Sequence, residues 1–363
     1  MNIGIIGAGA ISGTYLSSIQ ENFPELNIVA ISARNLSNAQ KKGREYGIRA
    51  CETEELLANP KIEMVIVLTP VDSHYSIIKQ SLLSGKHVYT EKTITRTTAQ
   101  AKELMNIAKE KGLYLGAAPD TFLGATYQTA RHAIDSGSLG NINSFCISIN
   151  RDNNILTALF PFLRLPGAGA LRDYMVYYLT ALVSLLGPIS QVSAFIQTPY
   201  KRRVNNVPNT LNFNETIDTP NESVISAIVK MQSGIIGTIH QNNESIIVDK
   251  ADFAILGTKG ILTVGCPNFF DSNISMLTPL GYSSITETHL AQIDGYTGNA
   301  RGIGAAEMAR AIQDKRKHRA NADIAYHVLE VIEAMEKSSE IGQMVKIDST
   351  CTLPEFLPGK LQE

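Results

Sequence analysis

The sequence lacks the features that would place it in several other protein classes. It has four cysteines in 363 residues and no CxxC pair, so neither a disulfide framework nor a zinc site is expected. No apolar run approaches the ~18 residues of a membrane helix, and no basic segment of the signal-peptide kind opens the chain. The 32 basic and 34 acidic residues leave a net charge of -2, which gives no electrostatic reason to expect nucleic acid or an anionic membrane as a partner. These absences predict a cytoplasmic globular protein with reduced thiols.

Sequence patterns of several enzyme classes are missing too. There is no P-loop lysine pattern, no GxSxG nucleophile turn and no HExxH zinc motif. The seven histidines are dispersed along the chain. We therefore expect no metal site, and the chemistry must rest on other residues.

The N-terminus carries a glycine-rich turn between a strand and a helix. A short apolar run at residues 2–6 leads into Gly7-Ala8-Gly9-Ala10-Ile11-Ser12, after which a helical pattern begins. Gly7 permits a tight turn, and Gly9 lets the backbone approach a pyrophosphate at the helix N-terminus. Ser12 stands at the third glycine position of the motif. The pattern predicts that Gly7, Gly9, Ala10 and Ile11 bind the phosphates of a dinucleotide.

Strand-like and helical runs then alternate through residues 1–120. Strands are expected at 26–31, 64–68, 87–90 and 113–117, and helices at 39–46, 73–84 and 98–111. This alternation predicts an α/β fold with a doubly wound parallel sheet, a Rossmann domain, whose ligands bind beyond the carboxyl ends of the strands. Polar residues stand at three of these ends, namely Ser32 and Arg34, Thr69 and Pro70, and Glu91 and Lys92.

The residues after the second strand bear on the choice of cofactor. An acidic residue would be expected about 20 positions after the glycine turn to hold the ribose 2′-hydroxyl of NAD. Ser32, Ala33 and Arg34 stand there instead, and a guanidinium can grip a 2′-phosphate. We predict that NADP is preferred and that NAD is possible, because the arginine can also simply stack on adenine.

The second part of the chain, residues 121–363, has a different character. Alternating strands are expected at 143–150, 191–197, 223–230, 235–241, 251–256 and 261–264, with helices at 126–134, 305–316 and 322–338. They predict an α/β domain built on a large, mostly antiparallel sheet. A long apolar helix reaches Leu186 and contains Asp173 and Tyr177, four residues apart and so on one face. A charge on such a helix is either buried with a partner or lines a pocket, and we favour the pocket.

These residues resemble the Gfo/Idh/MocA family of oxidoreductases over nearly the whole chain. The matching pieces are GAGAIS at 7–12, TPVDSH at 69–74, EKT at 91–93, GAGALRDYMVYYLTALVSLLGP at 167–188 and the segment 319–342. The resemblance implies that Thr69, Pro70, His74, Glu91 and Lys92 contact the cofactor, where Glu91 either meets the ribose or orients the lysine. It also implies that Lys92, Asp173 and Tyr177 are catalytic, with Tyr177 at the position of a family histidine. The implied substrate is a sugar or polyol, and the implied assembly is a homodimer, through the outer face of the sheet, or a homotetramer.

The chain also departs from the family pattern. Thr93 replaces a proline, and Met175 and Val176 replace a Gly-Pro pair, which we expect to push bulk toward the substrate. The leading hypothesis is an NAD(P)-dependent dehydrogenase or reductase acting on CH–OH groups. A catalytically silent NAD(P)-binding sensor and a reductase of a non-sugar C=O, C=N or C=C bond are the alternatives. A sensor would need neither Lys92 nor Asp173.

Overall fold

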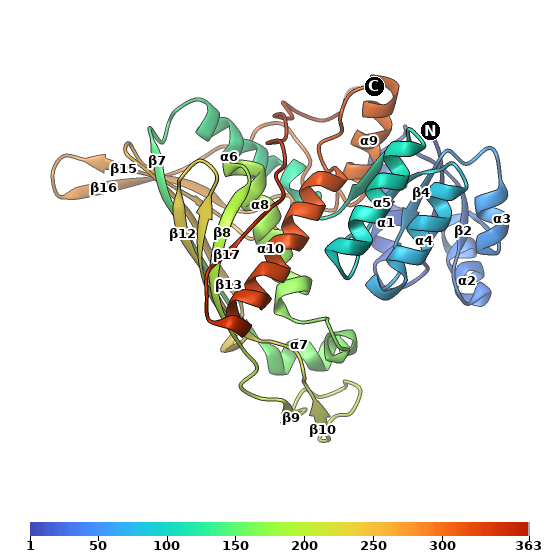
Figure 1. The fold of residues 1–363 in the computed structure, drawn as a ribbon, viewed down its shortest axis with the longest axis horizontal. Coiled ribbons are helices and arrows are strands. Elements are labelled where there is room, and N and C mark those ends of the chain that lie inside the picture. Colours follow the sequence, from blue (N-terminus) through green and yellow to red (C-terminus); the bar gives the residue numbers. More distant parts are fainter. Residues whose placement is uncertain (362–363) are drawn as a thin grey trace.

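The computed structural model describes the backbone of residues 1–361 and all of their side chains except those of 248 and 249. Two sheets divide the molecule, a parallel one built by the first third of the chain and a larger mixed one built by the rest (Figure 1). Among the described residues, no helix is both long and apolar enough to cross a bilayer.

The first sheet is a Rossmann sheet, as predicted. Its order is β3-β2-β1-β4-β5-β6, with every pairing parallel. The strands are β1 (Asn2–Ile6), β2 (Asn27–Ser32), β3 (Arg49–Ala50), β4 (Met64–Val67), β5 (His87–Thr90) and β6 (Leu115–Ala117). The helices between them are α1 (Ser12–Asn22), α2 (Leu36–Tyr46), α3 (Thr53–Ala58), α4 (Val71–Leu83) and α5 (Thr98–Glu110). The order reverses between β1 and β4, and such a switch point is where sheets of this kind bind their ligands.

The second sheet has nine strands in the order β16-β15-β14-β13-β7-β12-β11-β8-β17. They are β7 (Ile142–Asp152), β8 (Ile189–Gln197), β11 (Val224–Met231), β12 (Ile236–Asn242), β13 (Glu244–Gly257), β14 (Ile261–Val264), β15 (Ile274–Leu280), β16 (Ser284–His289) and β17 (Val345–Lys346). All pairs are antiparallel except β7 with β12, which confirms a mostly antiparallel sheet.

Helices cover the inner face of this sheet and connect it to the first domain (Figure 1). They are α6 (Ala125–Asp135), α7 (Asn153–Leu159), α8 (Val176–Leu186), α9 (Ile303–Gln313) and α10 (Ala322–Ile341). The Asn321 side chain caps α10 by accepting from the amides of Asp323 and Ile324, and Gly342 ends it with φ +65. The Asn321 backbone also forms a β-bridge with Gly116, so this late segment returns to the first sheet.

Several elements were not expected from the sequence. They are the short β3 and α3, the helix α7, the hairpin of β9 (Arg202–Val204) and β10 (Thr216–Asp218), and the arm of β15 and β16 that extends the large sheet (Figure 1). The long apolar helix also differs from the expectation, because it begins as a π-helical turn, Leu171–Met175, before α8. Asp173 lies in that wider turn and Tyr177 in the α-helix, so regular i, i+4 spacing does not describe the pair.

Candidate active site

The glycine turn has the geometry that a dinucleotide needs. Gly7 has φ +123, and a Cβ there would lie 2.6 Å from the backbone carbon of Leu68, so no other residue fits. Nothing lies within 4 Å of a Cβ built on Gly9, which leaves its backbone open to a ligand. The Ser12 hydroxyl donates to the Gly9 carbonyl oxygen at 2.7 Å and so fixes the turn. Ala10 is exposed and Ile11 half-buried beside it, as phosphate-binding positions should be.

The loop after β2 presents an arginine to solvent. Arg34 is exposed, and its side chain makes no hydrogen bond or ion pair within the described part of the chain. Ser32 is fully buried, and its hydroxyl accepts a hydrogen bond from Thr53 at 3.2 Å. Arg34 is therefore the freer of the two predicted cofactor contacts at this strand end.

The loop after β4 is fastened by a histidine. Thr69 is half-buried and Pro70 exposed, at the edge where the glycine turn also lies. His74 is fully buried, with Nδ1 2.8 Å from the Thr93 carbonyl oxygen and Nε2 2.8 Å from that of Thr69. Burial lowers the pKa of His74, although both carbonyl oxygens favour its charged form. This geometry gives His74 the role of joining two cofactor-edge loops, and its contact with the cofactor stays a prediction.

Glu91 and Lys92 follow β5 at the same edge of the sheet. The buried Glu91 carboxylate accepts from the Tyr15 hydroxyl at 2.6 Å and from the Lys92 amide at 3.1 Å. The Lys92 ammonium donates to Asp173 Oδ1 at 2.9 Å and to the Asp173 carbonyl oxygen at 2.6 Å. Although burial disfavours its charge, the Asp173 carboxylate raises the pKa of Lys92 above its ordinary value. Lys92 is thus a fixed cation at neutral pH.

Thr93 is held firmly although it replaces a proline. Its hydroxyl donates to the Thr95 carbonyl oxygen at 2.9 Å, its carbonyl oxygen contacts His74, and the Lys92–Thr93 peptide bond is cis. Met175 and Val176 do not add bulk to the cavity beside Asp173, contrary to expectation. Both are buried in the hydrophobic core and neither lines a cavity beside Asp173.

Tyr177 joins Lys92 and Asp173 from the start of α8. It is buried, and the Lys92 nitrogen lies 5.3 Å from the centre of its ring. Burial raises the pKa of Tyr177, while the nearby charges of Lys92 and Arg301 act to lower it. The structure therefore brings together the three residues expected to be catalytic, and it adds Arg301, which sequence reasoning missed.

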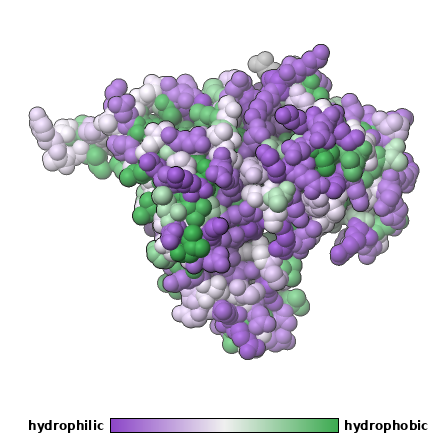
Figure 2. All heavy atoms as spheres, viewed as in Figure 1, coloured by the Kyte–Doolittle hydropathy of each residue, from purple (hydrophilic) through white to green (hydrophobic). Residues whose placement is uncertain are grey.

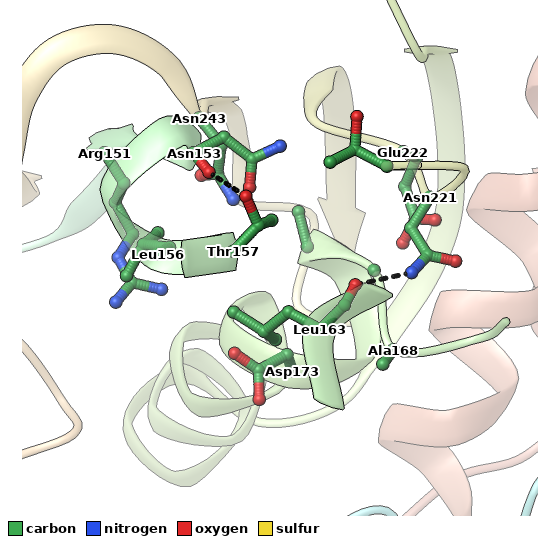
Figure 3. A pocket seen from close by; sticks show the side chains of 13 residues that line it. Arg151, Asn153, Leu156, Thr157, Leu163, Ala168, Asp173, Asn221, Glu222 and Asn243 are labelled. Carbon is green, nitrogen blue, oxygen red and sulfur yellow. Dashed lines mark hydrogen bonds between the residues drawn. The ribbon is translucent and has the colours of Figure 1, made fainter. Parts of the chain in front are cut away.

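A small polar cavity, partly open to solvent, adjoins Asp173 (Figure 3). Amides, hydroxyls, two carboxyl groups and one guanidinium line it, contributed by β7, α7, the π-helical turn and the segment before β11. The lining residues are Arg151, Asn153, Leu156, Thr157, Leu163, Ala168, Gly169, Ala170, Asp173, Thr219, Asn221, Glu222 and Asn243. Two hydrogen bonds lie within the wall of the cavity and are drawn as dashed lines (Figure 3). The Thr157 hydroxyl donates to the Asn153 carbonyl oxygen, and the Asn221 side-chain amide donates to the Leu163 carbonyl oxygen.

Two charged residues of this cavity could not be identified from the sequence. The Glu222 carboxyl accepts from the Leu171 amide, and burial raises the pKa of Glu222. The Arg151 guanidinium stacks 3.7 Å from the centre of the Tyr174 ring, and its Nε is buried without a hydrogen-bond partner among the described residues. In the sequence both residues border ordinary strands, and only the fold brings them near Asp173. The part of the chain that the structure describes holds no cluster of three or more histidine, cysteine or acidic residues suited to a metal ion.

Comparison with known proteins agrees with this geometry. The family model described as "Oxidoreductase family, NAD-binding Rossmann fold" matches residues 1–118, and "GFO/IDH/MocA C-terminal domain" matches residues 127–263. "Levoglucosan dehydrogenase, complex with NADH" superposes with a TM-score of 0.83 at 18% identity, covering 96% of this chain and 99% of that one. This likeness establishes the fold.

Two curated relatives are similar over part of the chain. "Uncharacterized oxidoreductase C26H5.09c" of Schizosaccharomyces pombe is 28% identical over 199 residues, which are 52% of this chain and 54% of the relative. "scyllo-inositol 2-dehydrogenase (NADP(+)) IolW" of Bacillus subtilis is 27% identical over 194 residues, or 53% and 54% of the two chains. The chain thus spans about half the length of these relatives. On both family models and the matching fold, it belongs to the Gfo/Idh/MocA family of oxidoreductases.

Proposed function

We propose that this chain transfers hydride between a nicotinamide cofactor and a carbon–oxygen centre of a sugar, polyol or sugar derivative. Residues 1–120 bind the cofactor, and residues 121–363 bind the substrate and a second copy of the chain. One observation carries the proposal: the Lys92–Asp173 pair, with Tyr177 beside it, lies at the cofactor edge of the Rossmann sheet, and Asp173 also lines a polar cavity.

The glycine turn fits the cofactor. A Cβ at Gly7 would collide with backbone, and the open space over Gly9 admits a pyrophosphate at the N-terminus of α1. Thr69, Pro70 and Glu91 stand at the edge nearest the nicotinamide half, and Arg34 is free to meet a 2′-phosphate, which supports NADP as the preferred cofactor. When bound, the nicotinamide ring supplies or accepts the hydride.

Lys92, Tyr177 and the cavity beside Asp173 have separate roles in the proposed reaction. The Lys92 ammonium, held by Asp173, stabilises negative charge on the reacting oxygen. The Tyr177 hydroxyl gives that oxygen its proton in reduction and takes it back in oxidation. The lining also holds three asparagine amides and two threonine hydroxyls. The Asn221, Thr157 and Thr219 donors already bind carbonyl oxygens of the protein, and the polar groups that are left suit a compound with several hydroxyl groups.

The two alternatives make different predictions in one experiment. Purified protein is incubated with NADP⁺ or NADPH and a panel of polyols, sugars and non-sugar carbonyl compounds, and the nicotinamide absorbance is followed. Turnover of polyols or sugars that disappears in Lys92→Met supports the proposal. Tight cofactor binding without turnover of any compound supports a sensor, and turnover confined to non-sugar carbonyls supports the other reductase.

A homodimer through the outer face of the large sheet is part of the proposal. On that face Phe195 of β8, Ile228 of β11 and Ile236 of β12 are 70%, 61% and 54% exposed. Ile228 lies opposite Thr238 of β12, and Ser226, its neighbour on the same face, lies opposite Phe195, so the apolar side chains come from adjacent strands. Figure 2 shows hydrophobic residues gathered over the strands of this sheet. Burying them against a second copy removes apolar area from water.

A further inference from the structure

Two cationic side chains, from two different parts of the chain, lie near the ring of Tyr177. Lys92 Nζ lies 5.3 Å from the ring centre, and Arg301 Cζ lies 5.5 Å from it. Lys92 follows β5 of the Rossmann sheet, whereas Arg301 stands in the loop before α9, in the second domain. Tyr177 is thus contacted by a positive charge from each half of the molecule.

Arg301 is anchored at one nitrogen and unpartnered at another. Its Nη2 donates to the side-chain oxygen of Asn268 at 2.7 Å and to the Asn268 carbonyl oxygen at 3.3 Å. Its Nη1 is buried and has no hydrogen-bond partner in the described structure. A buried guanidinium N–H without a partner is costly, so its position calls for a functional reason.

The backbone around Arg301 is docked onto the cofactor domain. The Asn299 side chain donates to the Thr14 carbonyl oxygen of α1, and the Asn299 carbonyl oxygen accepts from the Ser18 hydroxyl. Gly302, the residue after Arg301, lies so close to Ile19 of the same helix that a Cβ there would be 2.8 Å from the Ile19 side chain. The guanidinium is therefore held at a fixed distance from the Rossmann domain as well as from Tyr177.

The charges around Tyr177 are not equally available to it. Four charged groups act on its hydroxyl, namely Lys92, Arg301, Glu91 and Asp173. Lys92 is in direct contact with Asp173, so much of its charge is already balanced. Glu91 accepts from Tyr15 and from the Lys92 amide. Arg301, in contrast, has no carboxylate within ion-pair distance among the described residues, although Tyr177, Glu91, Tyr15 and Asp120 lie near enough to raise its pKa against the effect of burial. Arg301 is therefore the cation beside Tyr177 that has no direct ion-pair partner in the described structure.

We infer that Arg301 is the positioning residue of the proton-transfer step, and that its guanidinium stabilises the phenolate that Tyr177 becomes when it gives its proton to the substrate. This inference rests on the proposed function. In reduction, hydride from the nicotinamide forms the new C–H bond and the C=O π electrons move to oxygen. The Tyr177 proton then forms the O–H bond and leaves the phenolate, which solvent reprotonates. Oxidation of the alcohol is the reverse.

The pH profile of alcohol oxidation tests the assignment, because oxidation needs the phenolate and its rate rises through the pKa of Tyr177. Without the cation the phenolate is harder to form. Arg301→Met should therefore move the rising limb of kcat upward by about one to two pH units, a ten- to hundredfold loss below it. Arg301→Lys should keep the limb near its native position. A uniform loss of kcat in Arg301→Met, with the limb unmoved, overturns the inference.

A spectroscopic titration separates this inference from the proposed function, since it needs no substrate. The near-ultraviolet tyrosinate absorbance of the native protein minus that of Tyr177→Phe reports ionisation of Tyr177 alone. The same difference spectrum, measured between Arg301→Met and the double variant Arg301→Met/Tyr177→Phe, should show Tyr177 ionising at higher pH. If Tyr177 ionises at the same pH with and without Arg301, the inference is overturned even if turnover is found. If Arg301→Met does not fold, Asn268→Ala removes the side chain that anchors Arg301 Nη2 and should shift the Tyr177 titration to higher pH by a smaller amount. An unchanged titration in that variant contradicts the inference.

A matched control excludes a general effect of losing a half-buried arginine. Arg131 of α6 is bound to Asp135 and to the Pro354 carbonyl oxygen, and none of its contacts is with a site residue. Arg131→Met should leave both the kcat limb and the Tyr177 titration unchanged. If it shifts them as Arg301→Met does, the effect is not specific and the inference fails.

Discussion

Asp173 holds the Lys92 ammonium twice, through its carboxylate at 2.9 Å and through its own carbonyl oxygen at 2.6 Å. The two side chains are 17% and 19% exposed, so the pair is largely shielded from bulk water, and its Asp173 member lines the cavity. A cation held this way keeps its charge at neutral pH and cannot easily give up a proton. The pair therefore separates two tasks: Lys92 polarises the reacting oxygen, and the proton must come from another group.

Replacing Lys92 tests the first of these tasks. Lys92→Met should lower kcat by about 10²–10⁴-fold, because the charge that stabilises the reacting oxygen is lost. Lys92→Arg should restore little, since a planar guanidinium cannot occupy the point between the two Asp173 oxygens in the same way. Circular dichroism verifies that both variants are folded. Near-native kcat in folded Lys92→Met would falsify the catalytic role.

Cofactor choice depends on the loop after β2. Arg34 is exposed beside the small, buried Ala33, so a 2′-phosphate can meet the guanidinium without displacing another side chain. A charge-assisted contact of ~1.5–3 kcal/mol predicts that NADPH binds about ten- to a hundredfold more tightly than NADH. Fluorescence titration of both reduced cofactors measures this ratio. Ala33→Asp should shift the ratio toward NADH, and equal affinities in the native protein would contradict the prediction.

His74 should matter more for stability than for cofactor affinity. His74→Leu removes the buried imidazole that lies between the carbonyl oxygens of Thr69 and Thr93. A neutral ring donates to only one of them, so the expected cost is about 1–3 kcal/mol. Urea unfolding should show that loss, while His132→Leu, at an exposed position of α6, should change little. A large loss of cofactor affinity at unchanged stability would instead make His74 a direct cofactor contact.

The outer face of the large sheet gives a test of assembly. Ile228→Glu places a charge in the centre of the exposed apolar strip, where a second copy would desolvate it. Light scattering should find a dimer for the native chain and a monomer of native secondary structure for the variant. The matched control is Ile285→Glu on the β16 arm, which is equally apolar and 70% exposed but away from this strip. A native monomer contradicts the dimer.

The Rossmann half could be predicted closely because its signals are local. Each strand is a short apolar run next to a turn, and β5 has the predicted bounds, 87–90. The hairpin β9–β10 and the arm β15–β16 could not be predicted, for a physical reason. Most of their positions are polar or exposed, so their sequences lack the regular alternation of apolar and polar residues that a half-buried strand shows.

The site residues also divide into those that have a local sequence signal and those that only tertiary packing brings to the site. Lys92 and Asp173 belong to motifs, so both could be identified from the sequence. Arg301 stands in a loop of ordinary composition, and only tertiary packing against α1 and Asn268 brings it to Tyr177. Met175 and Val176 were misjudged because α8 is buried on all sides, so apolar residues at its start pack into the core, and because it is preceded by a π-helical turn. Backbone irregularities of this kind have no clear sequence signal.

The last prediction concerns the source of the proton in reduction. It compares two neighbouring tyrosines of α8, Tyr177 and Tyr178. Burial raises the pKa of Tyr177, so the phenol stays protonated at neutral pH and is ready to act as an acid in reduction. Reduction should therefore be independent of pH near neutrality and fall on the alkaline side, as the phenol ionises. Oxidation should rise over the same alkaline range.

Tyr177→Phe should lower kcat by about 10²–10⁴-fold and remove the alkaline limb in both directions. Tyr178→Phe is the matched control, because Tyr178 is fully buried on the same helix and its hydroxyl has no partner among the described residues. Removing that hydroxyl should leave kcat and its pH profile as they are, and it should not weaken the fold, since no hydrogen bond is lost. If Tyr177→Phe costs only about tenfold and keeps the limb, Tyr177 merely orients the substrate, and the proton comes from solvent or from Lys92.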